Sequence, residues 1–452
     1  MGIVSEPKGI ADVRSGRLDE AALRANFSDL HPALTKHEAL VEADRCYFCF
    51  DAPCQTACPT SIDIPLFIRE IAAGNPLGAA ETILSANIMG GMCARVCPTE
   101  TLCEEACVRE KAEGKPVRIG LLQRHAVDAQ MATGKTPFAR KAPTGKRVAV
   151  LGAGPAGMAC AHELALNGVE AIVLEKREKA GGLNEYGIAA YKAPDDFAAK
   201  EIDFILTTGG IEVKRGVALG RDVTLETLTQ DYDAVFLGVG LGGTNKLGLA
   251  GEGAIANVVD AIDFIADLRQ AKDLASLPVG RRVVVIGGGM TAVDAAVQSK
   301  RLGAEIVTIA YRRGIDDMKA SRFERELAQT NGVTIRPWAR PLGLESHGGA
   351  VSGVLFEHVK LQDGQLVTAG DAFRIEADVV FTAIGQTGAF DIFGAGGPEI
   401  KGGKIVVDGE RRTSLPKVWA GGDCVAGGQD LTVSAVEDGK QAARSILKTL
   451  FG

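Results

Sequence analysis

The sequence predicts two kinds of structure in one chain: an α-helical N-terminal region over residues 1–140, and after it two nested α/β folds. Three observations carry this prediction. Eight of the ten cysteines lie between Cys46 and Cys107, among segments that begin with helix-start signals. Two apolar strands, near residues 146–151 and 281–286, each run into a glycine-rich turn and a helical stretch. The C-terminal stretch LPKVWAGGDCVAGG supplies a further strand and glycine turn.

Length and charge limit the class of protein. The chain has 452 residues, enough for roughly three domains, and a net charge of −7 without a basic stripe, which argues against nucleic-acid binding. The start lacks an apolar targeting segment, and no run of about 18 apolar residues occurs, so we expect neither secretion nor membrane insertion but a cytoplasmic protein. In that reducing compartment, dense cysteines indicate metal or catalytic sites and not disulfides.

Helices of the N-terminal region are predicted from their capping residues. Thr35 and Glu38 form a capping-box pattern that predicts a short helix ending before Cys46. An acidic or amide residue followed by Pro predicts two more helix starts, at residues 63–65 and 75–76. A further helix is expected over residues 117–130, before a polar linker.

Cysteine spacing is the strongest chemical signal in this region. Two of the cysteines, Cys58 and Cys97, are followed by Pro, which is typical of iron–sulfur sites, where the cysteine before the Pro reaches a second cluster. By that logic Cys58 joins the later cysteines, and the three before it share another cluster. A pair of zinc sites is the alternative, since zinc also uses short cysteine spacings. The eight cysteines are Cys46, Cys49, Cys54, Cys58, Cys93, Cys97, Cys103 and Cys107.

The segment KRVAVLGAGPAG contains the first dinucleotide-binding fingerprint of the Rossmann type. Gly152, Gly154 and Gly157 allow a tight turn and close approach of backbone to a pyrophosphate at the start of the following helix. The next predicted strand ends at Glu175, 175 − 157 = 18 residues beyond the last glycine. A carboxylate at this position accepts a hydrogen bond from a ribose hydroxyl.

The C-terminal glycine turn favours FAD as the dinucleotide at this first fingerprint. Asp423 follows Gly421 and Gly422 at the end of a predicted strand, as in flavoproteins with two dinucleotide folds, where such an Asp holds the ribityl chain. A helix predicted from about Leu431 onward directs its N-terminus to the flavin, where it stabilises negative charge. The alternative is that Asp423 only caps its loop.

A second fingerprint, RRVVVIGGGMTA, places Gly287, Gly289 and Ala292 in the same arrangement. Counting the same 18 residues past Ala292 reaches Ala310, so no carboxylate is available for a ribose hydroxyl.

Basic residues follow at that point instead, and guanidinium groups suit a 2′-phosphate. The sequence therefore favours NADPH over NADH, with a solvated turn as the alternative. The basic residues are Arg312, Arg313 and Lys319.

The order of these signals predicts the domain organisation. The second fingerprint lies between the two halves of the FAD signature. We therefore expect a helical iron–sulfur domain over residues 1–140, an FAD domain formed by 141–252 and 387–452, and an NAD(P) domain of 253–386 inserted in it.

With these motifs, the chain from about residue 33 onward resembles the electron-input subunit of bacterial NAD(P)-dependent dihydropyrimidine dehydrogenase, within the superfamily of the glutamate synthase small subunit. The interval CPTETLC is longer than in many glutamate synthase subunits, although electron-bifurcating ferredoxin:NADP oxidoreductases share it. Gln123 in IGLLQR is similar to a Gln ligand of dihydropyrimidine dehydrogenases. The segments CPTSIDI and GGLNEYGI also resemble that branch, and Ala189 departs from the Pro of many relatives.

This resemblance implies two 4Fe-4S clusters and assigns their ligands, leaving Cys93 outside both sets. It also places Gly182, Leu183 and Gly422 among the cofactor-binding residues, and no side chain of this chain is expected to act as a catalytic acid, base or nucleophile. The implied ligands of the first cluster are Cys46, Cys49, Cys54 and Cys107, and those of the second are Cys58, Cys97, Cys103 and Gln123.

The function implied is electron transfer from NAD(P)H through FAD and both clusters to a partner subunit. That partner carries FMN and iron–sulfur clusters and reduces uracil or thymine to the 5,6-dihydropyrimidine. The alternatives are a glutamate synthase small subunit, a bifurcating ferredoxin:NADP oxidoreductase subunit, a flavin disulfide reductase, or a non-enzymatic redox-sensing scaffold. Neither Cys160 nor Cys424 belongs to a CxxC pair, which argues against the disulfide reductase.

Overall fold

The computed structural model describes residues 13–452, and its contacts divide them into two units. The first unit consists of residues 31–185, 195–243 and 387–452. The second unit consists of residues 13–30, 186–194 and 244–386. The boundaries predicted for three domains, at residues 140, 252 and 386, stay a prediction.

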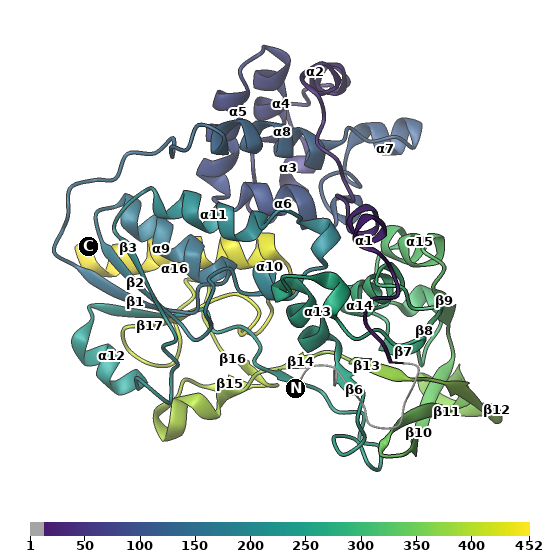
Figure 1. Ribbon diagram of the computed structural model, residues 1–452. Coiled ribbons are helices and arrows are strands. Elements are labelled where there is room, and N and C mark those ends of the chain that lie inside the picture. The colour runs from purple at the N-terminus through teal and green to yellow at the C-terminus, as the bar shows by residue number, and fades with distance from the viewer. Residues whose placement is uncertain (1–12) are drawn as a thin grey trace. The chain divides into compact units, whose positions relative to one another are not determined.

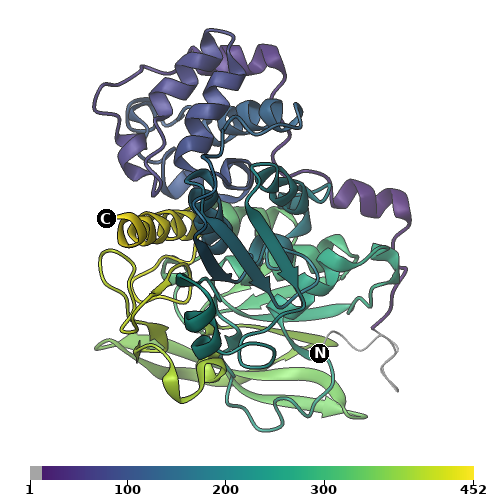
Figure 2. The same cartoon turned by 90° about the vertical axis from the view of Figure 1, so that its left-hand side faces the viewer.

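Short helices make up the N-terminal part of the first unit. Both views show them as a group of their own beside the sheet of the same unit (Figure 1, Figure 2). They are α2 (Lys36–Ala43), α3 (Pro53–Ala57), α4 (Ile64–Ala72), α5 (Pro76–Ala86), α6 (Gly90–Val96), α7 (Val108–Glu113) and α8 (Ile119–Met131).

The predicted helix starts are confirmed. Thr35 caps α2 with a full capping box, in which its side chain and that of Glu38 each accept from the other's backbone N–H. Asp63 and Asn75 cap α4 and α5 with their side chains, and Pro lies in the first turn of both helices.

A parallel five-stranded sheet follows, in the order β17-β4-β1-β2-β3. Helices α9, α10, α11, α12 and α16 belong with it. The strands are β1 (Arg147–Leu151), β2 (Glu170–Glu175), β3 (Ile211–Arg215), β4 (Ala234–Leu237) and β17 (Val418–Ala420). The helices are α9 (Pro155–Leu166), α10 (Leu183–Tyr186), α11 (Phe197–Leu206), α12 (Leu225–Asp231) and α16 (Thr432–Phe451).

Helix α16 brings the end of the chain back against the first fingerprint. It runs beside α9 (Figure 1), and the two helices touch through their backbones at Gly439. A Cβ atom on Gly439 would lie 2.0 Å from the carbonyl oxygen of Ala156, so only glycine fits there. The helix predicted from about Leu431 is therefore confirmed, with Leu431 as its N-cap.

The second unit contains a second parallel sheet, in the order β6-β13-β7-β8-β9. Its strands are β6 (Val258–Asp260), β7 (Arg282–Gly287), β8 (Ile306–Ala310), β9 (Thr334–Arg336) and β13 (Val379–Ala383). Its helices are α1 (Glu20–Asn26), α13 (Ala261–Gln270), α14 (Met290–Arg301) and α15 (Arg322–Thr330).

One further sheet of this unit has no counterpart in the sequence-based prediction. It is antiparallel and consists of β10 (Ala339–His347), β11 (Ala350–Gln362) and β12 (Gln365–Glu376). Residues 13–30 and 186–194 also pack with this unit, although they are far from it in sequence. The predicted fold class, a helical region followed by two α/β dinucleotide folds, is confirmed. Among residues 13–452, no helix combines the length and apolarity that a membrane crossing needs.

Candidate cofactor sites

The cysteines expected at the first cluster include residues of the loop after α2 and the residue directly before α7. Burial raises the pKa of the Cys46 thiol, and the neighbouring thiols of Cys107 and Cys49 raise it further. Burial and the charges of the neighbouring Cys107 and Cys46 thiols together raise the pKa of Cys54 to about 12. The thiols of Cys49 and Cys107 thus lie close to that of Cys46, and those of Cys46 and Cys107 lie close to that of Cys54. Such crowding fits a positively charged iron–sulfur core, which binds thiolates.

The second group lies where α6 ends. The pKa of Cys97 is raised by a hydrogen bond with Cys93, by burial, and by the charges of Cys93, Cys103 and Cys58. Burial raises the pKa of Cys103, and the charges of Glu104, Cys58 and Cys54 raise it further. The structure therefore brings together the three cysteines expected at the second cluster, and it adds Cys93 to them.

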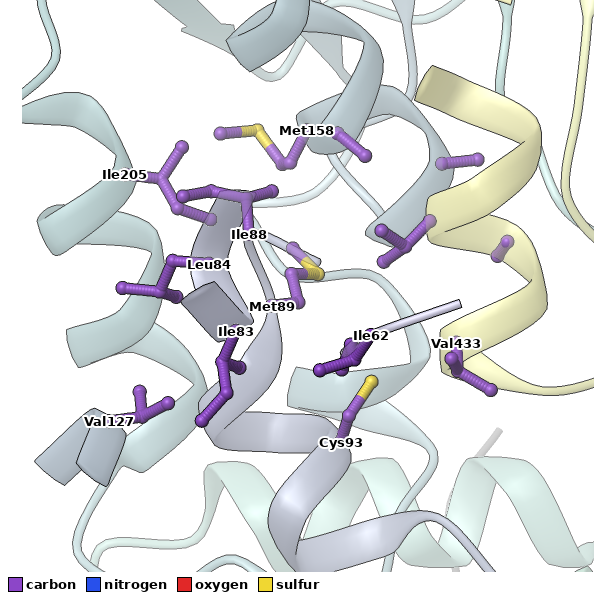
Figure 3. Close-up of a cluster of buried hydrophobic side chains, with 14 of the residues drawn as sticks. Ile62, Ile83, Leu84, Ile88, Met89, Cys93, Val127, Met158, Ile205 and Val433 are labelled. Carbon is purple, nitrogen blue, oxygen red and sulfur yellow. The ribbon is translucent and has the colours of Figure 1, made fainter. Parts of the chain in front are cut away.

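Cys93, which contacts this second group, and Gln123, which contacts the start of α6, lie in different surroundings. Cys93 is 3% exposed and belongs to an apolar core, where Figure 3 shows it beside Ile62. Gln123, on α8, is buried, and its Nε2 donates a 2.7 Å hydrogen bond to the carbonyl oxygen of Gly90 at the start of α6. The Gln123 amide oxygen therefore keeps its lone pairs for another partner. No three His, Cys, Asp or Glu residues in the described part of the chain are arranged around a single-ion metal site.

The first fingerprint forms a turn whose close contacts only glycines allow. A Cβ atom on Gly157 would lie 1.9 Å from the Gly152 carbonyl oxygen, and one on Gly152 would lie 2.3 Å from that of Gly238. Gly182, with φ +56°, approaches Gly154 so closely that a Cβ would be 2.7 Å from its Cα. A turn with this bare backbone at the start of α9 fits the pyrophosphate of a dinucleotide.

Glu175 ends β2 beside this turn, as predicted. Glu175 is 6% exposed, and its carboxylate accepts backbone hydrogen bonds of 2.8 Å from Ala153 and Arg177. Because each oxygen has a second lone pair, the carboxylate can still accept from a ribose hydroxyl. Leu183, which follows Gly182, is the first residue of α10.

Asp423 lies after β17, at the carboxyl edge of the same sheet. Burial raises the pKa of Asp423 to about 6, with Asp430 acting in the same direction and Lys404 against it. The Asp438 carboxylate on α16 holds this loop by accepting from the backbone N–H of Gly422, at 2.9 Å. Within residues 13–452 no hydrogen bond reaches the Asp423 carboxylate, which is therefore available to a polar ligand group.

The second fingerprint forms a similar turn after β7. Gly287 has φ +155°, and a Cβ on it would lie 2.3 Å from the Ala383 carbonyl oxygen at the end of β13. Gly289 is the N-cap of α14 and has no atom within 4 Å of its missing Cβ, so this part of the turn is open. Ala292 is fully buried within α14, where the third glycine of the fingerprint would lie.

The three basic residues of the second fold are all exposed on the segment that follows β8. In the described chain, the side chains of Arg312, Arg313 and Lys319 have no ion pair or hydrogen bond. The segment is held against the glycine turn because Ala320 N–H donates to the Gly288 carbonyl at 3.0 Å. Three unpaired cations beside a dinucleotide turn fit an additional phosphate.

Sequence reasoning missed Gly238, which follows β4 and closes the first turn. No cofactor role is predicted from the sequence for the segment FLGVGLGG, yet the Gly238 carbonyl oxygen packs against Gly152. A glycine directly after a strand that pairs with β1 was the available signal, because neighbouring parallel strands end at the same edge.

Two family models match the chain. Residues 23–135 match dihydropyrimidine dehydrogenase domain II, a 4Fe-4S cluster domain. Residues 146–439, more than half of the chain, match the pyridine nucleotide-disulphide oxidoreductase family.

Curated relatives match over nearly the whole chain. The small chain of glutamate synthase [NADPH] from Escherichia coli (strain K12) is 36% identical, covering 94% of each chain. The NAD-dependent dihydropyrimidine dehydrogenase subunit PreT of the same strain is also 36% identical, covering 94% of this chain and 98% of its own. The two are equally similar to this chain.

Solved structures with the same fold cover about two thirds of the chain. Mycobacterium tuberculosis FprA in complex with NADPH aligns with a TM-score of 0.58 at 19% identity, over 68% of this chain and 84% of that one. Thioredoxin reductase from T. acidophilum aligns with a TM-score of 0.53 at 22% identity, over 68% and 98%.

The matched domains bring iron–sulfur, FAD and NAD(P) as cofactors. The presence of exactly two clusters and the individual ligands stay predictions. The chain belongs to the pyridine nucleotide-disulphide oxidoreductase family, a family of NAD(P)-dependent oxidoreductases, and it combines that domain with an N-terminal 4Fe-4S cluster domain.

Proposed function

We propose that this chain is the electron-input subunit of a dihydropyrimidine dehydrogenase. It takes electrons from NAD(P)H and passes them, through FAD and two 4Fe-4S clusters, to a partner subunit that reduces uracil or thymine. The observation that carries the proposal is one continuous core that contains both cysteine groups and the helix of the first fingerprint. Cys58, Cys93 and Cys107 belong to the same buried cluster of side chains as Ala156 and Met158 of α9.

This continuity matters because electrons pass between cofactors only over short distances through packed protein. FAD held by the first fingerprint would supply the conversion between two-electron hydride transfer from the nicotinamide and single-electron transfer to the clusters. The residues of this chain bind and orient the cofactors. The backbone turn at Gly152–Gly157 is open to a pyrophosphate, and the Asp423 carboxylate is open to a hydroxyl.

A partner is part of the proposal because nothing in the described chain suggests a pyrimidine site. The relative PreT is named as a subunit of a dihydropyrimidine dehydrogenase, and Gln123, which resembles a cluster ligand of that branch, is buried and hydrogen-bonded to the start of α6, the helix that carries Cys93 and leads into Cys97. The cytoplasm provides both nucleotide and reducing conditions for such a complex.

The test measures two activities with one preparation under anaerobic conditions. The chain alone is expected to reduce an artificial dye with NADPH or NADH, and to reduce uracil only after its partner is added. The partner is obtained by purifying the native complex and identifying the second polypeptide. Uracil reduction by the isolated chain would contradict the division of labour, and failure to bleach bound flavin with either nucleotide would favour a redox-sensing scaffold.

A second function, the small subunit of a glutamate synthase, is supported by the equal similarity to that relative. The same purification distinguishes the two. A larger partner that makes the complex consume glutamine and 2-oxoglutarate would replace our proposal, whereas an FMN-containing partner that confers uracil reduction would support it.

A further inference from the structure

The second fold contains a tryptophan whose backbone conformation is unusual. Trp338 lies between β9 and β10 with φ +58°, a left-handed conformation that is a clear outlier for a bulky side chain. Backbone strain of this kind persists only where the surrounding structure imposes it, and it concentrates at functional sites. The contacts of Trp338 show what it holds in place.

Both the backbone and the ring of Trp338 contact the segment with the basic residues. Its N–H donates to the Arg313 carbonyl oxygen at 3.0 Å, and its own carbonyl oxygen accepts from Val359 of β11 at the same distance. The six-membered part of the indole covers Gly314, where a Cβ atom would lie 2.9 Å from the ring. Trp338 therefore fixes the residues directly after Arg313 against a long strand.

The same segment is tied to the glycine turn at its other end. The Tyr311 ring covers Gly288, since a Cβ there would lie 2.6 Å from two ring carbons. The Tyr311 hydroxyl donates to the Asp317 carbonyl oxygen at 2.9 Å, and the Asp317 carboxylate accepts from Gly314 N–H at 3.0 Å. The turn thus keeps one shape without using the side chains of Arg312 or Arg313.

The first fold differs at the equivalent place. There β2 ends in a carboxylate, Glu175, whereas β8 ends in the buried Ala310 and is followed by Tyr311. The two most informative relatives also differ, since one is named for NADPH and the other for NAD. Coenzyme choice is therefore a property that this segment can determine.

We propose that Trp338 is a positioning residue for the 2′-phosphate of NADP(H), and that by holding the Arg312–Arg313 turn beside Gly288 it sets the preference for NADP(H) over NAD(H). The inference rests on the proposed function, in which this fold binds NAD(P)H. A pre-shaped turn loses little conformational freedom on binding, so the arginines keep most of the phosphate interaction as affinity.

The experiment measures equilibrium binding of 2′,5′-ADP and of 5′-AMP to the full-length, flavin-loaded chain by titration calorimetry. The two probes differ only in the 2′-phosphate. The unaltered chain is expected to bind 2′,5′-ADP at least tenfold more tightly. Trp338→Gly, which relaxes the backbone and removes the ring, is expected to lose that discrimination at least tenfold while its affinity for 5′-AMP changes less than twofold. Trp338→Phe, which keeps a ring over Gly314, is expected to retain most of it.

Arg313→Ala separates the role of Trp338 from the assignment of this fold to NADP(H). If the unaltered chain shows no preference for 2′,5′-ADP, the NADP(H) assignment fails and the inference fails with it. If Arg313→Ala loses the preference but Trp338→Gly keeps it, only the role of Trp338 is overturned. Equal losses of affinity for both probes in Trp338→Gly would also overturn the role of Trp338. Such losses would indicate general damage to the fold and not a role in discrimination.

Discussion

Gln123 is the one expected cluster ligand that is not a cysteine, and its replacement tests the ligand assignment. A neutral amide leaves its cluster one charge less negative than a thiolate would, and net charge influences the reduction potential. Gln123→Cys is therefore expected to lower the potential of the second cluster. Redox titration followed by EPR spectroscopy measures both clusters in the same sample, so the first cluster serves as an internal reference.

Cys93 provides the matched control, because its thiol is hydrogen-bonded to Cys97 and lies in the same group. Cys93→Ser is expected to leave both EPR signals in place. Loss of the second signal in Cys93→Ser would show that Cys93 is the fourth ligand, and an unchanged or higher potential in Gln123→Cys would contradict the role of Gln123.

Lys192 is a buried charge whose removal should be costly. Its ammonium group lies 2.7 Å from both the Asp294 and the Glu324 carboxylates, all within the second unit. Lys192→Met leaves two carboxylates buried without their cation, so we expect a loss of about 3–5 kcal/mol in the free energy of unfolding. Denaturant unfolding followed by circular dichroism measures it.

An exposed ion pair supplies the comparison for that prediction. Lys448 pairs with Glu410 at 2.9 Å, but its side chain is 69% exposed. Lys448→Met is expected to cost less than about 1 kcal/mol. Equal effects of the two substitutions would mean that the Lys192 cluster is hydrated and contributes little.

At the scale of elements, α6 depends on a carboxylate from a distant helix. Glu201 on α11 is 1% exposed, and its Oε1 accepts from the N–H groups of Gly91 and Met92, at 2.8 and 3.0 Å. Burial raises the pKa of Glu201 to about 8, against the opposing effects of the Met92 N–H, the Arg95 charge and the Gly91 N–H. The carboxyl group is therefore mostly protonated near neutral pH.

This pKa gives stability a defined dependence on pH. The usual pKa of 4.5 applies to the unfolded chain, so between pH 4.5 and about 8 the folded chain binds more protons at Glu201. The contribution of Glu201 to the free energy of unfolding is then fully present below pH 4.5. It falls as pH rises to 8, by at most about 1.4 kcal/mol per pH unit. Glu201→Gln keeps the acceptor oxygen and should remove this slope.

The free energies of unfolding of the unaltered chain and of Glu201→Gln at pH 5, 6.5 and 8 show whether Glu201 causes this pH dependence. Glu212→Gln, on the exposed edge of the same unit, is the matched control and should leave the slope of the unaltered chain. A Glu201→Gln variant with the same slope as the unaltered chain would show that other groups cause it.

How far the sequence predicts these elements depends on the range of the interactions that form them. The caps of α2, α4 and α5 join residues three apart, so they are readable from the sequence. The contact between Glu201 and α6 joins residues 110 apart and leaves no local pattern. The sheet β10–β12 was missed for another reason: β12 is largely exposed, so it lacks the alternation of apolar and polar residues that marks a strand.

At the scale of the whole molecule, the motifs located the two glycine turns, but they did not indicate which distant segments pack together. Glycine fingerprints placed both turns, because each follows an apolar strand directly. Trp338 and Gly238 were not found, because their importance comes from contacts with residues elsewhere in the chain. Similarly, residues 13–30 pack with a sheet that begins more than two hundred positions later, which composition does not indicate.

The contact between Gly439 and the Ala156 carbonyl oxygen has a consequence for biosynthesis. Ala156 of the first fingerprint's helix emerges from the ribosome 439 − 156 = 283 residues before the residue that packs against it. At roughly 5–20 residues per second, that interval lasts on the order of 15 to 60 seconds. During this time the residues between them can fold, while the apolar side of α9 is not yet covered by α16. A nascent chain that stalls before α16 is therefore expected to expose α9 to chaperones and to retain no flavin.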